Sequence, residues 1–160
     1  MKHMWSEEEI EKLIEEHGGS GGSTLEDIVD SKGNKRFIEG NGAPATITGV
    51  TFTYNKWSLS GTHLMCVLAG TLAGNTFLDS NLKFTSFALP QYILDKIVPV
   101  YGTVIDVKTV KFYTDGGTAD DRSFYIKKTN GLLTFVLVSG GSLQSSRNFR
   151  IQMDLLIDSE

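Results

Sequence analysis

The chain has 160 residues, of which 40% are hydrophobic and 21% are charged, a composition typical of a folded protein with one full-sized core and a small appendage. Residues 1–40 hold 5 basic and 10 acidic residues, a net charge of −5, whereas residues 41–160 hold 10 basic and 9 acidic residues, a net charge of +1. Neither part has a block of Lys or Arg, which argues against nucleic-acid binding. The chain has no apolar run of about 18 residues, so we expect no membrane insertion.

The single cysteine, Cys66, excludes a disulfide within the chain, so the fold must be stabilised by packing. The N-terminus is acidic and lacks the basic and then apolar pattern of a secretory signal peptide. We therefore expect synthesis in a cytoplasm.

Residues 1–17 are predicted to form a short anchoring helix. Ser6 is a suitable N-cap, Glu9 completes a capping box, and Gly18 follows as a C-terminal stop. A helix of about 11 residues is marginal alone in water, so its apolar stripe needs a partner. That partner is either the same helix of other subunits or a groove on a larger assembly; the alternative is that the helix docks on its own body or frays. The stripe predicted to anchor or oligomerise the chain is Trp5, Ile10, Leu13 and Ile14.

Residues 18–23, GGSGGS, are predicted to be a flexible linker, either natural or an engineered joint. Residues 24–43 alternate short apolar pairs with turn residues and are predicted to form an extended or hairpin collar.

Residues 44–160 are predicted to form one mainly β domain, an antiparallel, jelly-roll-like β-sandwich. The clearest strand has Phe149, Ile151 and Met153 alternating with polar residues, the pattern of a strand with one buried face. Asn130-Gly131 indicates a tight hairpin, and Tyr54-Asn55 and Gly74-Asn75 are weaker turn signals. The predicted strands are residues 46–54, 56–60, 63–72, 82–88, 103–114, 122–128, 132–138 and 148–157.

One segment interrupts this pattern. Pro90 suits the first position of a helix, Ile93, Leu94 and Ile97 fall on one face, and Pro99 ends the run. We expect a short helix that plugs one end of the sandwich.

Catalytic signals are sparse, and the chain is predicted not to be an enzyme. His63 lies in a strand-like run and is predicted to be a partly buried or interface residue. Cys66 has apolar neighbours and is predicted to be a small buried hydrophobe. Asp115, Asp120 and Asp121 lack the spacing of an EF-hand loop and adjoin a Gly-Gly pair that disfavours the fixed separation of a catalytic carboxylate pair. We expect neither metal nor cofactor, and we expect this acidic run to be a solvated connection between strands.

Exposed aromatic residues beside polar loops would suit sugar binding, because amphipathic rings stack on sugars while Asp, Asn and Arg supply hydrogen bonds. The loops predicted to contribute span residues 115–122 and 139–147. The residues predicted to contact a ligand are Trp57, Tyr113, Asp115, Asp120, Asp121 and Arg122.

Three segments resemble the β-sandwich end domains of tail-fibre, head-fibre and related minor structural proteins of tailed phages: KWSLSGTHLMCVLAGTLAGNT (56–76), ALPQYILDKIVPV (88–100) and RNFRIQMDLLID (147–158). The opening MWSEEEIEKLIEEHG is similar to the helical starts of such virion proteins. The resemblance implies a homotrimeric appendage of the phage particle, anchored to other virion proteins by its N-terminus and displaying the sandwich to a host-surface glycan or protein. Its motifs are packing motifs, so no functional residue is carried over. The chain departs from a long fibre in having no extended coiled coil or shaft repeat.

Three functions therefore remain open. The first is a short trimeric fibre or adhesin subunit of a virion. The second is a monomeric carbohydrate-binding module. The third, a glycan-degrading enzyme, requires that Asp115, Asp120 and Asp121 converge in a rigid cleft.

Overall fold

The computed structural model describes residues 5–17, 28–117 and 119–157, and for residues 13–17 it describes the backbone alone. The predicted linker, residues 18–23, and the side chains of Leu13 and Ile14 lie outside the described part. Helix α1 (Glu7–His17) begins as predicted. The amide of Ser6 donates to Glu9 Oε2 over 2.8 Å, and the amide of Glu9 donates to Ser6 Oγ over 3.2 Å, which is a complete capping box.

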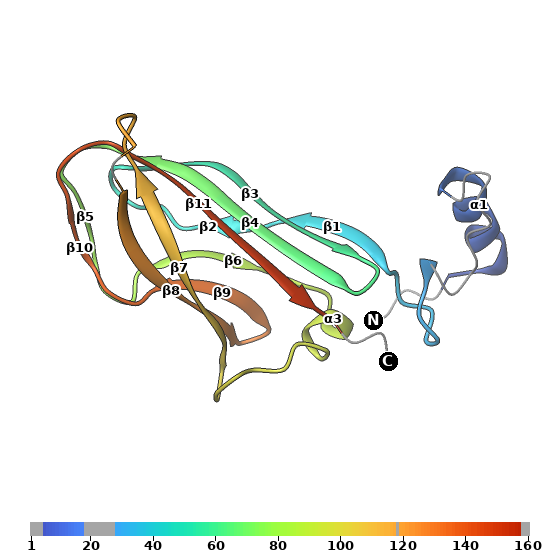
Figure 1. The fold of residues 1–160 in the computed structure, drawn as a ribbon. Helices are drawn as coiled ribbons and strands as arrows, with labels where there is room; N and C mark the ends of the chain where they lie inside the picture. The colour runs from blue at the N-terminus through green and yellow to red at the C-terminus, as the bar shows by residue number, and fades with distance from the viewer. Residues whose placement is uncertain (1–4, 18–27, 118, 158–160) are drawn as a thin grey trace.

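The body is mainly β, as predicted, and most of its strands belong to one antiparallel sheet (Figure 1). The strands follow the order β1 (Phe37–Asn41), β3 (Val50–Ser60), β4 (His63–Leu72), β11 (Arg147–Leu156), β7 (Val104–Tyr113), β8 (Ala119–Thr129), β9 (Leu132–Leu137), β6 (Lys83–Phe87) and β2 (Ala43–Pro44). A separate two-stranded sheet pairs β5 (Thr76–Leu78) with β10 (Gly141–Leu143).

The large sheet curls until its two edges nearly meet. Strands β1 and β2 lie at opposite ends of the strand order, yet only Gly42 separates them in sequence. The Gly42 amide donates to the carbonyl of Asn55 on β3 over 3.1 Å, and Thr85 Oγ1 on β6 lies 3.0 Å from Asn55 Oδ1. A Cβ at position 42 would lie 2.4 Å from Asn55 Oδ1 and 2.6 Å from Phe87 Cε1, so this close approach requires glycine.

An aromatic cluster joins two opposing parts of the curled sheet, which we call its layers. Strands β3 and β11 belong to one layer, and β6 and β8 belong to the other. The ring of Phe84 on β6 lies 6.1 Å from that of Phe52 on β3, 4.9 Å from that of Phe124 on β8 and 5.9 Å from that of Phe149 on β11, each edge to face. Phe84 is fully buried. Because its partners come from both layers, this residue lies at the centre of the core.

Helix α3 (Gln91–Leu94) lies at one end of the curled sheet, as the proline-bounded pattern predicts (Figure 1). Ile93 and Leu94 are buried, and the amides of both donate to the Pro90 carbonyl. Lys128 on β8 donates to the carbonyl of Leu94. The helix is shorter than the predicted segment, which ends at Pro99.

The turn predicted at Tyr54-Asn55 is wrong. Residues 50–60 form one strand, β3, with a bulge between Phe52 and Tyr54. A bulge adds one residue and reverses which side chains face the core. The local change in the pattern therefore marks a bulge within a strand and not a hairpin.

The Asn130-Gly131 hairpin is confirmed, because both residues have positive φ angles, 49° and 74°. Within the predicted collar, residues 24–43, the described residues supply β1 and the first residue of β2 to the large sheet. Strands β5 and β10 were not predicted; each has three residues, too few to show a period.

Candidate functional site

The outer face of the large sheet carries rows of aligned side chains across several strands. One row contains Thr51 on β3, Thr71 on β4, Asn148 on β11 and Tyr113 on β7. In the next row, Ala69 on β4 lies between Tyr54 on β3 and Arg150 on β11. Since Ala69 has a short side chain, it leaves room above the sheet between larger neighbours.

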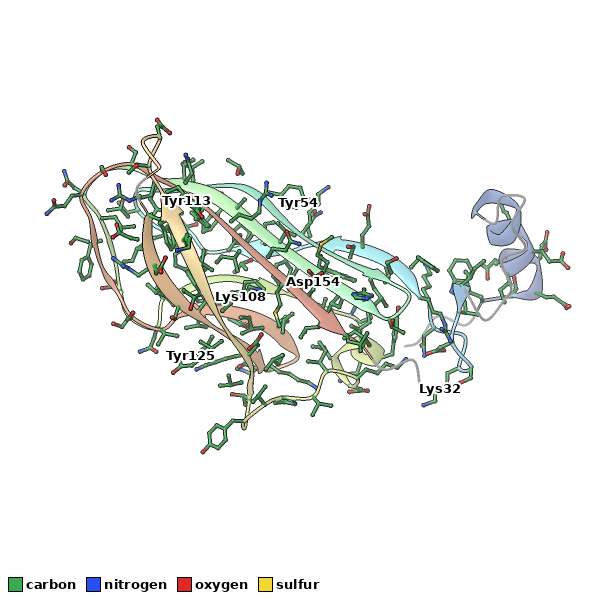
Figure 2. All side chains as sticks on the ribbon, viewed as in Figure 1. Lys32, Tyr54, Lys108, Tyr113, Tyr125 and Asp154 are labelled. Atoms are coloured by element: carbon green, nitrogen blue, oxygen red, sulfur yellow. The ribbon has the colours of Figure 1, made fainter. Side chains whose placement is uncertain are left out.

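Strands β7 and β11 pair at one end and then separate. At the paired end, Asn148 pairs with Tyr113 and Phe149 pairs with Phe112. Strand β11 by contrast pairs with β4 along ten positions. Figure 2 shows Tyr113 near the paired end and Lys108 farther along β7.

A groove of about 560 Å³ lies where the strands separate, and we call it the β7–β11 groove. It extends across four neighbouring strands of the sheet, β3, β4, β11 and β7. The residues that line it are Thr53, Ala69, Gly70, Thr71, Lys108, Thr109, Val110, Lys111, Tyr113, Asn148, Phe149, Arg150 and Gln152.

The groove is cationic. It is lined by Lys108, Lys111 and Arg150, and none of the described residues that line it is acidic. Lys111 Nζ lies 3.1 Å from Asp121 Oδ1, an exposed pair across β7 and β8. Within the described part of the chain, Lys108 and Arg150 have no carboxylate within ion-pair distance. Two positive charges therefore remain available to a ligand.

A second hollow of about 370 Å³ continues the groove, because Thr71 and Asn148 line both. It contains Asp115 and the buried Arg147. Arg147 Nη2 donates to Asp120 Oδ2 over 3.0 Å, which joins the start of β11 to β8. This second hollow carries charges of both signs, in contrast to the β7–β11 groove.

The predicted ligand residues therefore have different environments. Tyr113 lines the groove, and Asp115 lines the adjoining hollow. Asp120 and Asp121 are held in separate ion pairs with Arg147 and Lys111. These pairs orient the two carboxylates toward different cations, and neither Asp120 nor Asp121 lines the hollow that contains Asp115.

Arg122 is partly buried, and its Nη1 donates to the backbone carbonyl of the preceding residue, Asp121, over 3.0 Å. It does not line the groove or the adjoining hollow.

Trp57, which was predicted to contact a ligand, is buried in this structure. Its side chain is 5% exposed, because the β3 bulge turns it toward the core. Trp57 pairs with Gly40 on β1, and a Cβ at Gly40 would lie 2.5 Å from the indole nitrogen. The ring therefore covers the glycine and contributes to packing.

The predicted anchoring residues contact the same chain in part. Lys35 Nζ lies 4.5 Å from the centre of the Trp5 ring, a cation–π contact, and Ile10 is buried. Trp5 therefore contacts the segment that precedes β1, and the partner of the rest of the stripe stays a prediction.

The sequence did not identify Lys108, Arg150 or Gln152 as groove residues. The alternation of β11 was a usable signal, since it places Arg150 and Gln152 on the face opposite Phe149. The approach of β7 to β11 had no local signal, because it depends on how the sheet curls.

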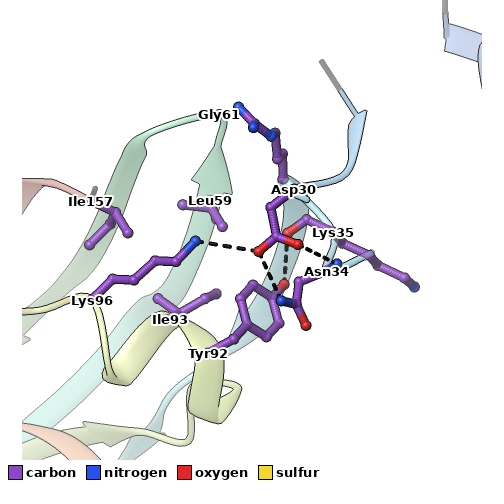
Figure 3. Close-up of a pocket in the computed structure, with 10 residues that line it drawn as sticks. Asp30, Asn34, Lys35, Leu59, Gly61, Tyr92, Ile93, Lys96 and Ile157 are labelled. Atoms are coloured by element: carbon purple, nitrogen blue, oxygen red, sulfur yellow. Dashed lines mark hydrogen bonds and ion pairs between the residues drawn. The ribbon is translucent and has the colours of Figure 1, made fainter. Parts of the chain in front are cut away.

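A further polar cluster lies beside α3, around a cavity of about 10 Å³ that has room for one water molecule at most (Figure 3). Asp30 accepts hydrogen bonds from Lys32 N at 2.9 Å and from Asn34 N and Nδ2, both at 2.8 Å. Lys96 Nζ lies 3.4 Å from Asp30 Oδ2, and Tyr92 Oη donates to the Lys35 carbonyl.

The titration of this cluster follows from its contacts. Burial alone would raise the pKa of Asp30, but the hydrogen bonds from Asn34 and Lys32 and the charge of Lys96 together hold it below its ordinary value. Burial, with the nearby charge of Asp30, raises the pKa of Tyr92 to about 12. The cluster joins residues 28–36 to α3 and has no space for a substrate.

Cys66 and His63, the other reactive side chains considered in the sequence, lie on β4. Cys66 is buried, and burial, with a smaller effect of Asp154, raises the pKa of its thiol to about 12. His63 is exposed at the start of β4. In the part of the chain that the structure describes, no three His, Cys, Asp or Glu side chains are grouped so as to hold a metal ion. Of the described helices, none combines the length and apolar character needed to cross a membrane.

No model of a known protein family matches the sequence, and a search of curated proteins also gives no match. Among solved structures, a reovirus attachment protein, sigma1, crystallised with alpha-2,3-sialyllactose, has a TM-score of 0.40 and 9% identity. The match covers 76% of this chain and 66% of sigma1, slightly less than two thirds of that protein chain.

Two further viral structures are similar at the same level. The fibre head protein of bovine atadenovirus type 4 has a TM-score of 0.35 and 11% identity, covering 72% of this chain and 97% of its own. Residues 117–326 of avian reovirus sigmaC have a TM-score of 0.36 and 14% identity, covering 92% of this chain and 86% of that chain. At TM-scores below 0.5 these similarities assign neither a family nor a function.

Proposed function

We propose that this chain is a virion structural protein of a phage, a short trimeric fibre or adhesin subunit that attaches the particle to a host surface. Its N-terminal part holds the protein to the virion, and its β domain is displayed outward. The β7–β11 groove is the surface that contacts the host molecule. The resemblance of residues 56–76, 88–100 and 147–158 to phage fibre end domains supports the virion assignment.

The observation that carries the attachment role is the groove itself. It combines an exposed aromatic ring, Tyr113, with hydroxyl, amide and cationic side chains on a rigid sheet. Sugar recognition uses this combination, because the ring packs on a pyranose face while polar groups hydrogen-bond its hydroxyls.

The proposed role is binding without catalysis. A glycosidase needs two carboxylates at a fixed separation across the scissile bond. Here Asp120 forms an ion pair with Arg147, and Asp121 forms one with Lys111. Asp115 lines the hollow that adjoins the β7–β11 groove. The geometry therefore favours recognition over hydrolysis.

A groove-filling variant tests the attachment role. Thr109 is exposed on β7 and lines the groove, so Thr109→Trp should fill it and abolish adsorption of the fluorescently labelled protein to a panel of bacterial cells. Thr129→Trp, at an exposed position of β8 outside the groove, is the matched control and should adsorb normally. Unchanged adsorption by a folded Thr109→Trp variant would refute the proposal.

The oligomeric state separates the proposal from its alternative, a monomeric carbohydrate-binding module that uses the same groove. Light scattering of the full chain should give about 53 kDa, three times 17.6 kDa. Removal of residues 1–23 tests whether the N-terminal part holds the subunits together. A monomer at tens of micromolar, with and without residues 1–23, would rule out the trimer and favour the carbohydrate-binding module.

A further inference from the structure

We infer that the β7–β11 groove selects a saccharide that carries negative charge, either a carboxylate or a phosphate; this inference rests on the proposed attachment function. It follows from the charges of the groove, from the space between them and from the backbone that borders it.

The first argument is charge. Three cationic side chains line the groove, and none of its described lining residues is acidic, although the whole chain has a net charge of −4. Lys111 is neutralised by Asp121, whereas Lys108 and Arg150 have no such partner within the described part of the chain. An anion placed between Lys108 and Arg150 would gain charge-assisted hydrogen bonds, and Arg can bind a carboxylate or phosphate with two parallel bonds.

The second argument is shape. Arg150 lies in the row of Ala69, and Tyr113 lies in the row of Asn148 and Thr71, two positions along the strands. Strands β7 and β11 are neighbours in the sheet, and both Tyr113 and Arg150 line the groove. A sugar ring packed on Tyr113 would therefore place an acidic substituent within reach of Arg150, while Asn148 and Gln152 contact its hydroxyls.

The third argument concerns the part of β7 and β11 where the two strands do not pair with each other. Beyond the pair of Phe149 with Phe112, the described residues of β7 and β11 form no ladder with each other. Any backbone N–H or C=O group that is left unpaired between these strands would hydrogen-bond a polar ligand. A hydroxyl-rich molecule satisfies such groups better than an apolar one does.

The test compares three probes of similar length by isothermal titration calorimetry on the full chain. A hyaluronan tetrasaccharide carries carboxylates, a glycerol phosphate oligomer carries phosphates, and chitotetraose is neutral. We expect one of the anionic probes to bind about tenfold or more tightly than chitotetraose, and its affinity to fall as salt is raised. The better anionic probe identifies which acidic group is preferred.

Variants then locate the binding. The double variant Lys108→Gln/Arg150→Gln should lose about tenfold or more in affinity for the anionic probe and leave binding of chitotetraose unchanged. Lys83→Gln, on β6 outside the groove, removes a positive charge elsewhere and should bind like the unmodified chain. Both variants should keep the unmodified circular dichroism spectrum and melting temperature, since all three residues are exposed.

Three results would overturn the inference: equal affinity for chitotetraose, an unchanged anionic affinity in the double variant, or no binding of either anionic probe at millimolar concentration. Failure of the proposed attachment role can be distinguished from failure of the charge selection by cell adsorption. If Thr109→Trp blocks cell adsorption while the double variant adsorbs normally, attachment holds and charge selection is wrong. If neither variant affects adsorption, the attachment role also fails.

Discussion

Asp30 and Lys96 lie 66 positions apart in the chain, yet their Oδ2 and Nζ atoms are 3.4 Å apart. Asp30 also caps the turn at Lys32 and Asn34. This carboxylate therefore connects the segment before β1 to the residue that follows helix α3 by two positions, and so orders both.

Replacing Asp30 should loosen this connection. We expect Asp30→Ala to lower the free energy of unfolding by about 2 to 3 kcal/mol, because the buried Asn34 and the partly buried Lys96 lose a charged acceptor. Urea denaturation followed by circular dichroism measures the change. Asp79→Ala, at an exposed loop position, is the control and should change stability by less than about 0.5 kcal/mol.

The same carboxylate predicts a pH dependence. The pKa of Asp30 is lowered by folding, so its stabilising contribution is complete above its ordinary value of about 3.9 and is lost as the pH falls through the lowered folded value. Urea midpoints measured between about pH 5 and pH 2 should fall less steeply for Asp30→Asn than for the unmodified chain. Identical slopes would contradict this assignment.

Phe84 should be among the most costly core positions to truncate. Its ring contacts aromatic rings from both layers, so Phe84→Ala should destabilise the fold by about 3 to 5 kcal/mol. Phe77→Ala removes the same atoms from a side chain that is 62% exposed and should cost much less. Similar losses in the two variants, measured by thermal or urea unfolding, would show that Phe84 does not join the layers.

Gly70 should not tolerate a methyl group. A Cβ there would lie 2.4 Å from the Thr51 carbonyl oxygen and 2.9 Å from Phe149 Cζ, so Gly70→Ala should cost about 1 to 3 kcal/mol. The control is Gly116→Ala, where the nearest atom would be 3.8 Å away. Equal urea midpoints for the two variants would contradict the close packing of β3, β4 and β11.

Cys66 should be inert in the folded protein. We expect no reaction with a thiol-specific chromogenic reagent at about pH 8 without denaturant, and complete reaction in urea. Since the folded pKa of about 12 lies above the ordinary value of about 8.5, the thiolate favours unfolding and stability falls as the pH rises. The Cys66 contribution should be roughly 1 to 2 kcal/mol between about pH 8.5 and pH 10, and Cys66→Ala should lack it.

The sequence correctly predicted the features that depend on interactions between residues close together in the chain. The reciprocal bonds of Ser6 and Glu9, the hairpin at Asn130-Gly131 and the alternation of β11 each depend on a few neighbouring side chains. The plug helix was likewise indicated by two prolines and one apolar face.

Features that depend on distant contacts were missed. The bulge in β3 reversed the face of Trp57, and the approach of Gly42 to Asn55 joined strands from opposite edges of the sheet. The groove was also unpredictable, because the sequence places Lys108 and Arg150 on strands with β8, β9 and β10 between them in chain order. Tyr113 and Trp57 were both predicted as ligand contacts from their residue type, which does not distinguish the exposed ring from the buried one.

The two-pair junction of β7 and β11 has a consequence for how this surface can evolve. Strand β11 gets its register from ten pairs with β4, and β7 gets its own from β8. Substitutions at exposed positions such as Lys108, Thr109 and Arg150 therefore leave both registers intact. These residues can therefore change without loss of the fold, while the buried positions of the same strands are held fixed by packing.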